Sequence, residues 1–273
     1  MAFVWLTSST LLAFLISVSA SYAQTNGVDS ATAEATHWTK IGKGLEIGVA
    51  ELSGGLLPGE ITLVKTSLKH MNPQVVRASS FGKHRANTEW FAKKTGASLC
   101  VNANFFDKSG DPLGLVISRG VEHKPVQLGG SLLTGLFLVY RDSLVIAGRD
   151  EKRTELGLEA VQAGPRLIIN GVPKLKDLDG KAQSRRSGVC LVSGTEYVIF
   201  VAASALRGPT LQELAHSLSL PSVGCREALN FDGGGSTQLY IPEDIAGAAS
   251  GFGGINIVGR DDVPTALCLF PST

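Results

Sequence analysis

The sequence predicts an α+β fold, a single strand-dominated domain with mixed, twisted sheets and a few short helices. Two observations support this fold class. Apolar residues come mostly in short or alternating runs of strand length, and clusters of Gly, Pro and Asp separate these runs. Only two segments combine helical periodicity with capping residues. With 44% apolar residues among 273 and no repeat of fixed period, the chain can bury one large core.

The first predicted element is a secretory signal peptide over residues 1–23. It contains the apolar run Leu11–Val18 and ends in a small-x-small cleavage pattern at residues 21–23. An uncleaved membrane anchor is the alternative, because no Lys or Arg precedes the apolar run. Residues 24–40, rich in Ala, Thr and Ser, predict a flexible linker. We therefore expect a secreted or periplasmic protein with its folded domain at 41–273 and no stable membrane span after cleavage.

Strand-length runs account for most of the expected elements in this domain. They end at Gly, Pro or Asp residues that favour turns. In chain order, the expected strands are 45–52, 61–67, 74–78, 97–101, 113–118, 136–140, 144–147, 159–163, 166–170, 187–192, 196–202, 228–231, 237–241 and 266–270.

Two helices are expected, at residues 87–96 and 210–218. The first begins at an Asn cap, carries lysines in its last turn and stops at a glycine, which favours the left-handed conformation that ends helices. The second begins with a capping box formed by Thr210 and Glu213, and its leucines lie on one face.

The cysteines and the net charge exclude several classes of protein. The four cysteines contain no CxxC pair, which argues against a zinc ribbon, and in an exported protein they are consistent with one or two disulfides in any of three pairings. Buried free thiols are the alternative. Lys and Arg total 25 against 24 Asp and Glu, so we expect no nucleic-acid partner. The absence of HExxH and GxSxG argues against a zinc hydrolase and an α/β-hydrolase.

The stretch NFDGGGSTQLY, residues 230–240, is the strongest candidate for a site. Asp232 follows an apolar strand and precedes three glycines, so a ligand can approach its carboxylate and the neighbouring backbone closely. The glycine amides, with the hydroxyls of Ser236 and Thr237, are expected to form an anion-holding concavity. A glycine-rich turn in which Asp232 makes a local Asx bond is the alternative.

Two further motifs carry polar side chains next to expected strands. Asn102 and Asn104 stand at alternate positions after a strand, so their carboxamides are expected on one side, where they suit sugar hydroxyls. The nearby Asp107 and Asp111 partly resemble a calcium loop that could bind a divalent cation, with a solvated turn as the alternative. No cofactor is required.

The third motif is an arginine pair, Arg185 and Arg186, at the start of an expected strand. Such a pair can present planar donor forks to a phosphate. The alternative is a surface pair neutralised by Asp177 and Asp179.

Taken together and in this order, VNANFFD, QAGPRLIINGV, SRRSGV, GPTLQELA and LNFDGGGSTQLY resemble the phosphodiester glycosidase family, over roughly residues 60 to 270. The DGGGST stretch matches the family pattern without change. Family members usually have a glycine where this chain has Asn104, and an Asp-Gly-Arg element where it has Ala202-Ala203-Ser204.

The resemblance implies an exported glycosidase that hydrolyses the sugar-phosphate bond of glycosyl-1-phosphodiesters. Substrates of the N-acetylhexosamine type or of envelope polysaccharides are expected, with a carbohydrate phosphodiester as the partner molecule. The implied catalytic residues are Asp232 and Arg186, and the implied substrate-binding residues are Asn102, Asn104, Gly164, Arg185, Gly233, Gly234, Gly235, Ser236 and Thr237, with no metal ligand. A carbohydrate-binding or polysaccharide-organising module without turnover is the main alternative. A plain β-rich structural domain is the third.

Overall fold

The computed structural model describes residues 36–52, 59–151, 155–203, 208–247 and 254–273. The folded unit spans Glu34–Thr273. The predicted signal peptide and most of the predicted linker lie outside the described residues. The first strand, β1 (Thr39–Lys40), pairs with the next one, so the folded chain already begins within the segment predicted as linker.

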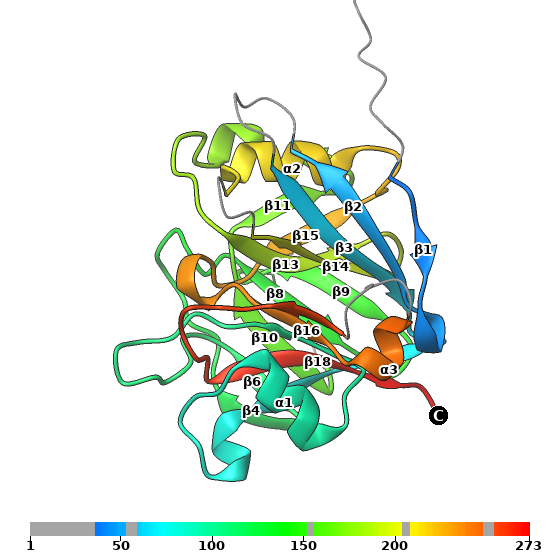
Figure 1. Ribbon diagram of the computed structural model, residues 1–273. Coiled ribbons are helices and arrows are strands. Elements are labelled where there is room, and N and C mark those ends of the chain that lie inside the picture. Colours follow the sequence, from blue (N-terminus) through cyan, green and yellow to red (C-terminus); the bar gives the residue numbers. More distant parts are fainter. Residues whose placement is uncertain (1–35, 53–58, 152–154, 204–207, 248–253) are drawn as a thin grey trace, which may run out of the picture. The chain divides into compact units, whose positions relative to one another are not determined.

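The largest sheet has eight strands, in the order β1-β2-β3-β14-β13-β15-β11-β12 (Figure 1). After β1 these are β2 (Glu46–Glu51), β3 (Glu60–Ser67), β11 (Arg166–Ile169), β12 (Val172–Pro173), β13 (Arg186–Leu191), β14 (Glu196–Ala202) and β15 (Glu227–Asn230). The strands β13 and β15 are central neighbours, and both carry motifs singled out above.

Two smaller sheets have five strands each, in the orders β7-β6-β10-β8-β9 and β17-β16-β5-β18-β4. Their strands are β4 (Met71–Arg77), β5 (Leu99–Asn102), β6 (Val116–Ser118), β7 (Val121–Lys124), β8 (Gly135–Val139), β9 (Leu144–Gly148), β10 (Glu159–Ala163), β16 (Leu239–Ile241), β17 (Ile255–Ile257) and β18 (Thr265–Pro271). All strand pairs among the described residues are antiparallel. The prediction of mixed sheets, with parallel as well as antiparallel pairs, is therefore wrong on this point. Short turns such as the one between β8 and β9 permit only antiparallel pairing.

The two expected helices are confirmed. In α1 (Thr88–Thr95) the Asn87 side chain accepts a hydrogen bond from the N–H of Trp90, and a left-handed Gly96 ends the helix. The capping box begins α2 (Leu211–Ser219), whose apolar face packs on the eight-stranded sheet near β11 (Figure 1). A third helix and four short 3-10 turns are too brief to show periodicity: α3 (Glu243–Ala246), η1 (Gly42–Gly44), η2 (Ala78–Phe81), η3 (Leu175–Asp177) and η4 (Gly234–Ser236).

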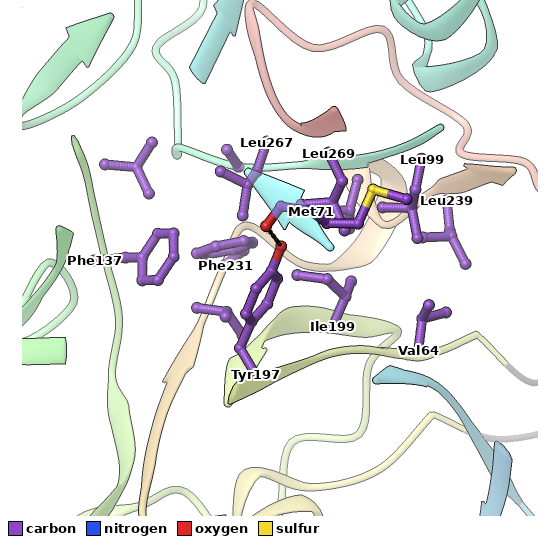
Figure 2. Packing of buried hydrophobic residues seen from close by; sticks show 14 of the residues in the cluster. Val64, Met71, Leu99, Phe137, Tyr197, Ile199, Phe231, Leu239, Leu267 and Leu269 are labelled. Carbon is purple, nitrogen blue, oxygen red and sulfur yellow. Dashed lines mark hydrogen bonds between the residues drawn. The ribbon is translucent and has the colours of Figure 1, made fainter. Parts of the chain in front are cut away.

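The three sheets share one apolar core. Leucines of β5, β16 and β18 meet Phe137 of β8 and Ile199 of β14, and the hydroxyl of Tyr197 donates to the carbonyl oxygen of Met71 at 2.9 Å (Figure 2). Phe231 is fully buried in this cluster. Because Phe231 follows β15 directly, the core fixes the chain at the residue that precedes Asp232.

Both disulfides form. Cys100 of β5 is bonded to Cys268 of β18, and Cys190 of β13 is bonded to Cys225. This selects one of the three pairings and excludes the alternative of buried free thiols. No helix in the described part of the chain is long and apolar enough to cross a membrane.

Candidate active site

The predicted carboxylate and arginines lie at the same end of two central strands of the eight-stranded sheet, β13 and β15. Since β13 and β15 are antiparallel neighbours, β13 begins where β15 ends. The N–H of Phe231 donates to the carbonyl oxygen of Ser187 at 2.8 Å, and the N–H of Asp232 donates to that of Ala103 at 3.1 Å. Asp232 is thus held between the end of β5 and the start of β13, where Arg186 stands.

The Asp232 carboxyl is half-buried, and its environment shifts its ionisation. Burial raises the pKa of Asp232 to about 6. Hydrogen bonds from the Ser236 hydroxyl and the Gly233 N–H oppose this rise, and the nearby charge of Asp261 adds to it. Asp232 is therefore ionised at neutral pH but within reach of protonation at mildly acidic pH.

The three glycines make room for side chains that press against the loop. A Cβ at Gly233 would lie 3.4 Å from Nη1 of Arg186, and a Cβ at Gly235 would collide with the carboxylate of Asp261. Gly234 has a φ of +62°, which side chains disfavour. The glycines therefore bring a guanidinium and a second carboxylate close to the backbone that follows Asp232.

Several of the amides that the sequence assigned to an anion-holding concavity already donate within the protein. The N–H of Gly234 donates to the carbonyl oxygen of Arg185 at 2.9 Å, while those of Ser236 and Thr237 donate to Gly233 and Gly234 within the 3-10 turn. These donors build the loop itself. The Thr237 side chain is also fully buried. A phosphate bound here depends on side-chain donors instead.

Arg186 supplies such donors beside Gly233. Its Nη2 donates to the carbonyl oxygen of Ala182 at 3.4 Å, and its buried Nε has no hydrogen-bond partner among the described residues. Burial lowers the pKa of Arg186, and the charge of Asp179 opposes this. Asp179 forms no ion pair with Arg186 among the described residues, and its carboxylate accepts hydrogen bonds from the N–H groups of Lys181 and Ala182.

Arg185 also contacts the glycine loop, since its carbonyl oxygen accepts from the N–H of Gly234. Its Nη2 donates to the carbonyl oxygen of Val258 at 2.8 Å, and its buried Nε has no partner in the described part of the chain. Burial lowers the pKa of Arg185, and so does the neighbouring charge of Arg260. The loop is therefore flanked by two guanidiniums with donors to spare, which suits an anionic group.

Asn102 holds the site together instead of facing a ligand. It is fully buried, and its Nδ2 donates to the carbonyl oxygen of Asp232 at 2.7 Å. Its Oδ1 accepts from the hydroxyl of Ser187 at 2.8 Å and from the N–H of Gln238 at 3.1 Å. One carboxamide thus joins β5, β13, β15 and the segment before β16, and it has no surface left for a sugar.

Asn104 and Gly164 are also buried, and Asn104 does not share a side with Asn102. The Nδ2 of Asn104 donates to the carbonyl oxygens of Leu115 and Gln162, and its Oδ1 accepts from Thr265. The carbonyl oxygen of Gly164 accepts from Nδ2 of Asn230 at 2.9 Å. The hydrogen bonds of these residues are all made within the protein, as part of the buried scaffold near the loop.

The remaining sequence candidates lie outside this cluster. Asp107 accepts hydrogen bonds from the Ser109 hydroxyl and the N–H of Asp111, as in a solvated turn. No group of three or more potential metal-ligating side chains occurs among the described residues. The side chain of Asp177 and the residue Ser204 are not among those described.

Three residues of the site were missed by sequence reasoning: Ser187, Gln238 and Asp261. The Gln238 carboxamide accepts from the N–H of Thr88 and donates to the carbonyl oxygens of Ser236 and Asp261, so it ties the loop to α1. The charged run at 260–262 after Gly259 was the available signal for Asp261. Nothing local marked it as a neighbour of Gly235.

Comparisons with known proteins were made for the whole chain. A model of the phosphodiester glycosidase family matches residues 95–270. No curated protein matches the chain.

Solved structures share the fold. The catalytic domain of zebrafish N-acetylglucosamine-1-phosphodiester alpha-N-acetylglucosaminidase, auto-inhibited by its pro-peptide, has a TM-score of 0.63 at 16% identity, over 86% of this chain and 88% of that one. A hypothetical protein from Synechocystis has a TM-score of 0.61 at 15% identity; the alignment covers 88% of this chain but only 64% of that one. An exported protein from Burkholderia pseudomallei has 0.54 at 12% identity, over 81% and 75%.

Proposed function

Because this chain belongs to the phosphodiester glycosidase family, we propose that it hydrolyses the sugar-phosphate bond of glycosyl-1-phosphodiesters, with Asp232 and Arg186 as its catalytic residues. The observation that carries the proposal is the arrangement around Gly233. This residue joins the half-buried Asp232 to the loop, and the Arg186 guanidinium lies against it. A carboxylate and a cation therefore both border Gly233, which supports a site that meets the sugar and the phosphate of a glycosyl phosphate.

The two side chains have complementary tasks in this reaction. Water adds to the anomeric carbon, the bond from that carbon to the phosphate oxygen breaks, and the electron pair leaves with the phosphomonoester. Arg186, assisted by Arg185, stabilises the charge on the departing phosphate. The ionised Asp232 stabilises the oxocarbenium character of the sugar, either through space, as a nucleophile or by activating the water.

A phosphate leaving group lowers the need for a general acid in this reaction. Phosphomonoesters are weakly basic, so their departure depends more on nearby cations than on protonation. The other residues implied by the resemblance then act indirectly. Asn102 fixes the backbone of Asp232, Ser236 stabilises its carboxylate, and the glycines leave space for Arg186 and for the substrate.

The name of the zebrafish relative gives the first substrate to test, an N-acetylglucosamine-1-phosphodiester. Release of free sugar from the methyl phosphodiester of α-N-acetylglucosamine 1-phosphate would be measured with the chain from Gln24 onward. We expect turnover by the wild type and a loss of about 10² to 10⁴-fold in kcat for Asp232→Asn and for Arg186→Ala.

Matched controls lie in the exposed turn between β8 and β9. Asp142→Asn and Arg141→Ala make the same chemical changes at solvent-exposed positions and should leave turnover unchanged. A wild type that binds the sugar phosphate without turnover, and loses binding in Asp232→Asn, would instead establish a carbohydrate-binding module.

We also propose that residues 1–23 are a signal peptide and that the mature protein is secreted or periplasmic. Two disulfides within the folded unit support this, because structural disulfides persist mainly in oxidising compartments. The mass of the protein recovered from a secreting host should correspond to a chain that starts at Gln24. A membrane-bound chain with an intact N-terminus would show that the segment is an anchor.

A further inference from the structure

A wide groove lies beside the glycine loop and is not used by the proposed catalytic residues. It has a volume of about 760 Å³ and is lined by Lys83, His84, Arg85, Arg260, Asp261 and Asp262. Its two walls are joined by a pair of backbone hydrogen bonds between Ala86 and Val263, of 2.9 and 3.0 Å. The groove is therefore part of the folded scaffold.

Aromatic rings and a glycine, not carboxylates, hold two cations of the groove. The Nζ of Lys83 lies 4.8 Å from the ring centre of Trp90, and the guanidinium of Arg85 lies 5.6 Å from that of Phe106. A Cβ at Gly110 would approach the Arg85 side chain to 3.2 Å. Such contacts orient a cation and leave its hydrogen-bond donors available.

No described carboxylate forms an ion pair with Lys83, Arg85 or Arg260. The two carboxylates of the groove are outnumbered by its three cations, and neither forms an ion pair with them among the described residues. That of Asp261 is turned onto Gly235, and that of Asp262 forms none of the ion pairs found in the described residues.

The groove continues directly from the candidate active site. The N–H of Arg260 donates to the carbonyl oxygen of Gly235 at 2.7 Å, so one wall of the groove begins at the glycine loop. Arg260 is also close enough to Arg185 for the two charges to interact. Positive groups therefore extend from Arg186 through Arg185 and Arg260 to Lys83 and Arg85.

We propose that this groove binds a second phosphate on the aglycone side of the scissile bond, so that the substrate is an oligomeric or polymeric glycosyl phosphodiester. This inference rests on the proposed function, because Arg186 is taken to bind the first phosphate. A single phosphodiester needs only the two arginines at the loop. A chain of repeating sugar phosphates fills the groove as well, and each repeat meets a cation that has no carboxylate partner.

Binding can be measured without turnover by titration calorimetry on the Asp232→Asn protein. The probes are a trimer of N-acetylglucosamine units joined by 1-phosphodiesters, the matching single phosphodiester, a galacturonate trimer and the uncharged chitin trimer. We expect Lys83→Ala with Arg85→Ala to weaken binding of the phosphodiester trimer by about tenfold or more at low ionic strength. The single phosphodiester should change by less than about twofold.

The control is Lys69→Ala with Arg141→Ala, which removes the same total charge at exposed sites outside the groove. A trimer that binds no more tightly than the single phosphodiester, or equal losses in the groove and control variants, would reject the second phosphate site. Equal affinity for the galacturonate trimer would reject its assignment to phosphate. If the groove binds the trimer while the wild type hydrolyses no phosphodiester, the glycosidase proposal fails and the anion site stands.

Discussion

Asp232 is charged only above the pH set by its environment, since burial raises its pKa to about 6. If the ionised carboxylate is the catalytic form, kcat/KM should fall about tenfold for each pH unit below about 6. Two neighbours should move this acid limb in opposite directions. Ser236→Ala removes a hydrogen bond that favours the anion and should raise its midpoint, whereas Asp261→Asn removes a like charge and should lower it.

The measurement is kcat/KM for the methyl phosphodiester across the acid range, with Asp142→Asn as the exposed control. An acid limb at the same pH in all four proteins would show that Asp232 does not set it. A general loss of stability would not explain opposite shifts in the two variants. It lowers activity, but it does not raise the midpoint pH of the acid limb in one variant and lower it in the other.

At the residue scale, strand ends pointed to Asp232 and to the pair Arg185 and Arg186, because a sheet exposes side chains there. The resemblance then selected Arg186, and the catalytic roles of Asp232 and Arg186 stay predictions. The predicted contacts of Asn102, Asn104 and the Gly234 amide were wrong, since a polar group near a ligand and a buried polar brace have the same local signature. Asp261 could not be predicted because its contact with Gly235 depends on tertiary packing.

At the scale of elements, the carboxamide of Asn102 joins β5 to three other segments: β13, the chain that follows β15, and the segment before β16. Asn102→Ala should lower the free energy of unfolding by about 2 to 4 kcal/mol, because it leaves the N–H of Gln238 and the carbonyl oxygen of Asp232 without this partner. Activity should fall through kcat, since the backbone that carries Asp232 loses its support. Urea unfolding and steady-state kinetics on the same preparation would measure both effects.

The matching control is Asn72→Ala, an exposed Asn on β4. If Asn102→Ala has normal stability and a raised KM, Asn102 binds the substrate directly. That outcome would contradict the hydrogen bonds described above.

All of the fourteen strands expected from the sequence overlap observed strands, because their alternating or apolar patterns extend over enough residues to be distinctive. The missed elements are short or exposed, such as β1, β12 and β17, and the core does not impose a pattern on them. The order of strands in the sheets was not predictable. Neighbours such as β5 and β18 are far apart in the chain, and a local pattern carries no information about distant partners.

On the scale of the whole molecule, buried hydrogen bonds connect different sheets in addition to their shared apolar core. The Glu159 carboxylate on β10 accepts hydrogen bonds from the N–H groups of Val75 on β4 and of Arg119, at 2.9 Å each. It therefore links the sheet of β8 and β10 to the sheet of β4 and β5. Glu159 is only 5% exposed, so the link lies in a region where ionisation is unfavourable.

This tie should make the stability of the fold depend on pH. Burial raises the pKa of Glu159 from 4.5 to about 7, in spite of both hydrogen bonds. The folded state therefore holds a proton that the unfolded chain releases, so the contribution is complete below about pH 4.5 and is lost as the pH rises through about 7. This difference in pKa corresponds to about 3 kcal/mol. Asp232, with its pKa raised to about 6, acts in the same direction and is best removed by working in Asp232→Asn.

In that background, Glu159→Gln should flatten the pH dependence between about pH 4.5 and 7, whereas Glu196→Gln, at an exposed position, should not. The variant should also be less stable at low pH by about 1 kcal/mol, because a carboxamide oxygen replaces only one of two acceptors. Urea unfolding with the disulfides intact, repeated at several pH values, would measure both effects. If the free energy of unfolding of Glu159→Gln still falls as the pH rises, the ionisation that weakens the fold belongs to another group. Glu159 would then link the two sheets without making stability depend on pH.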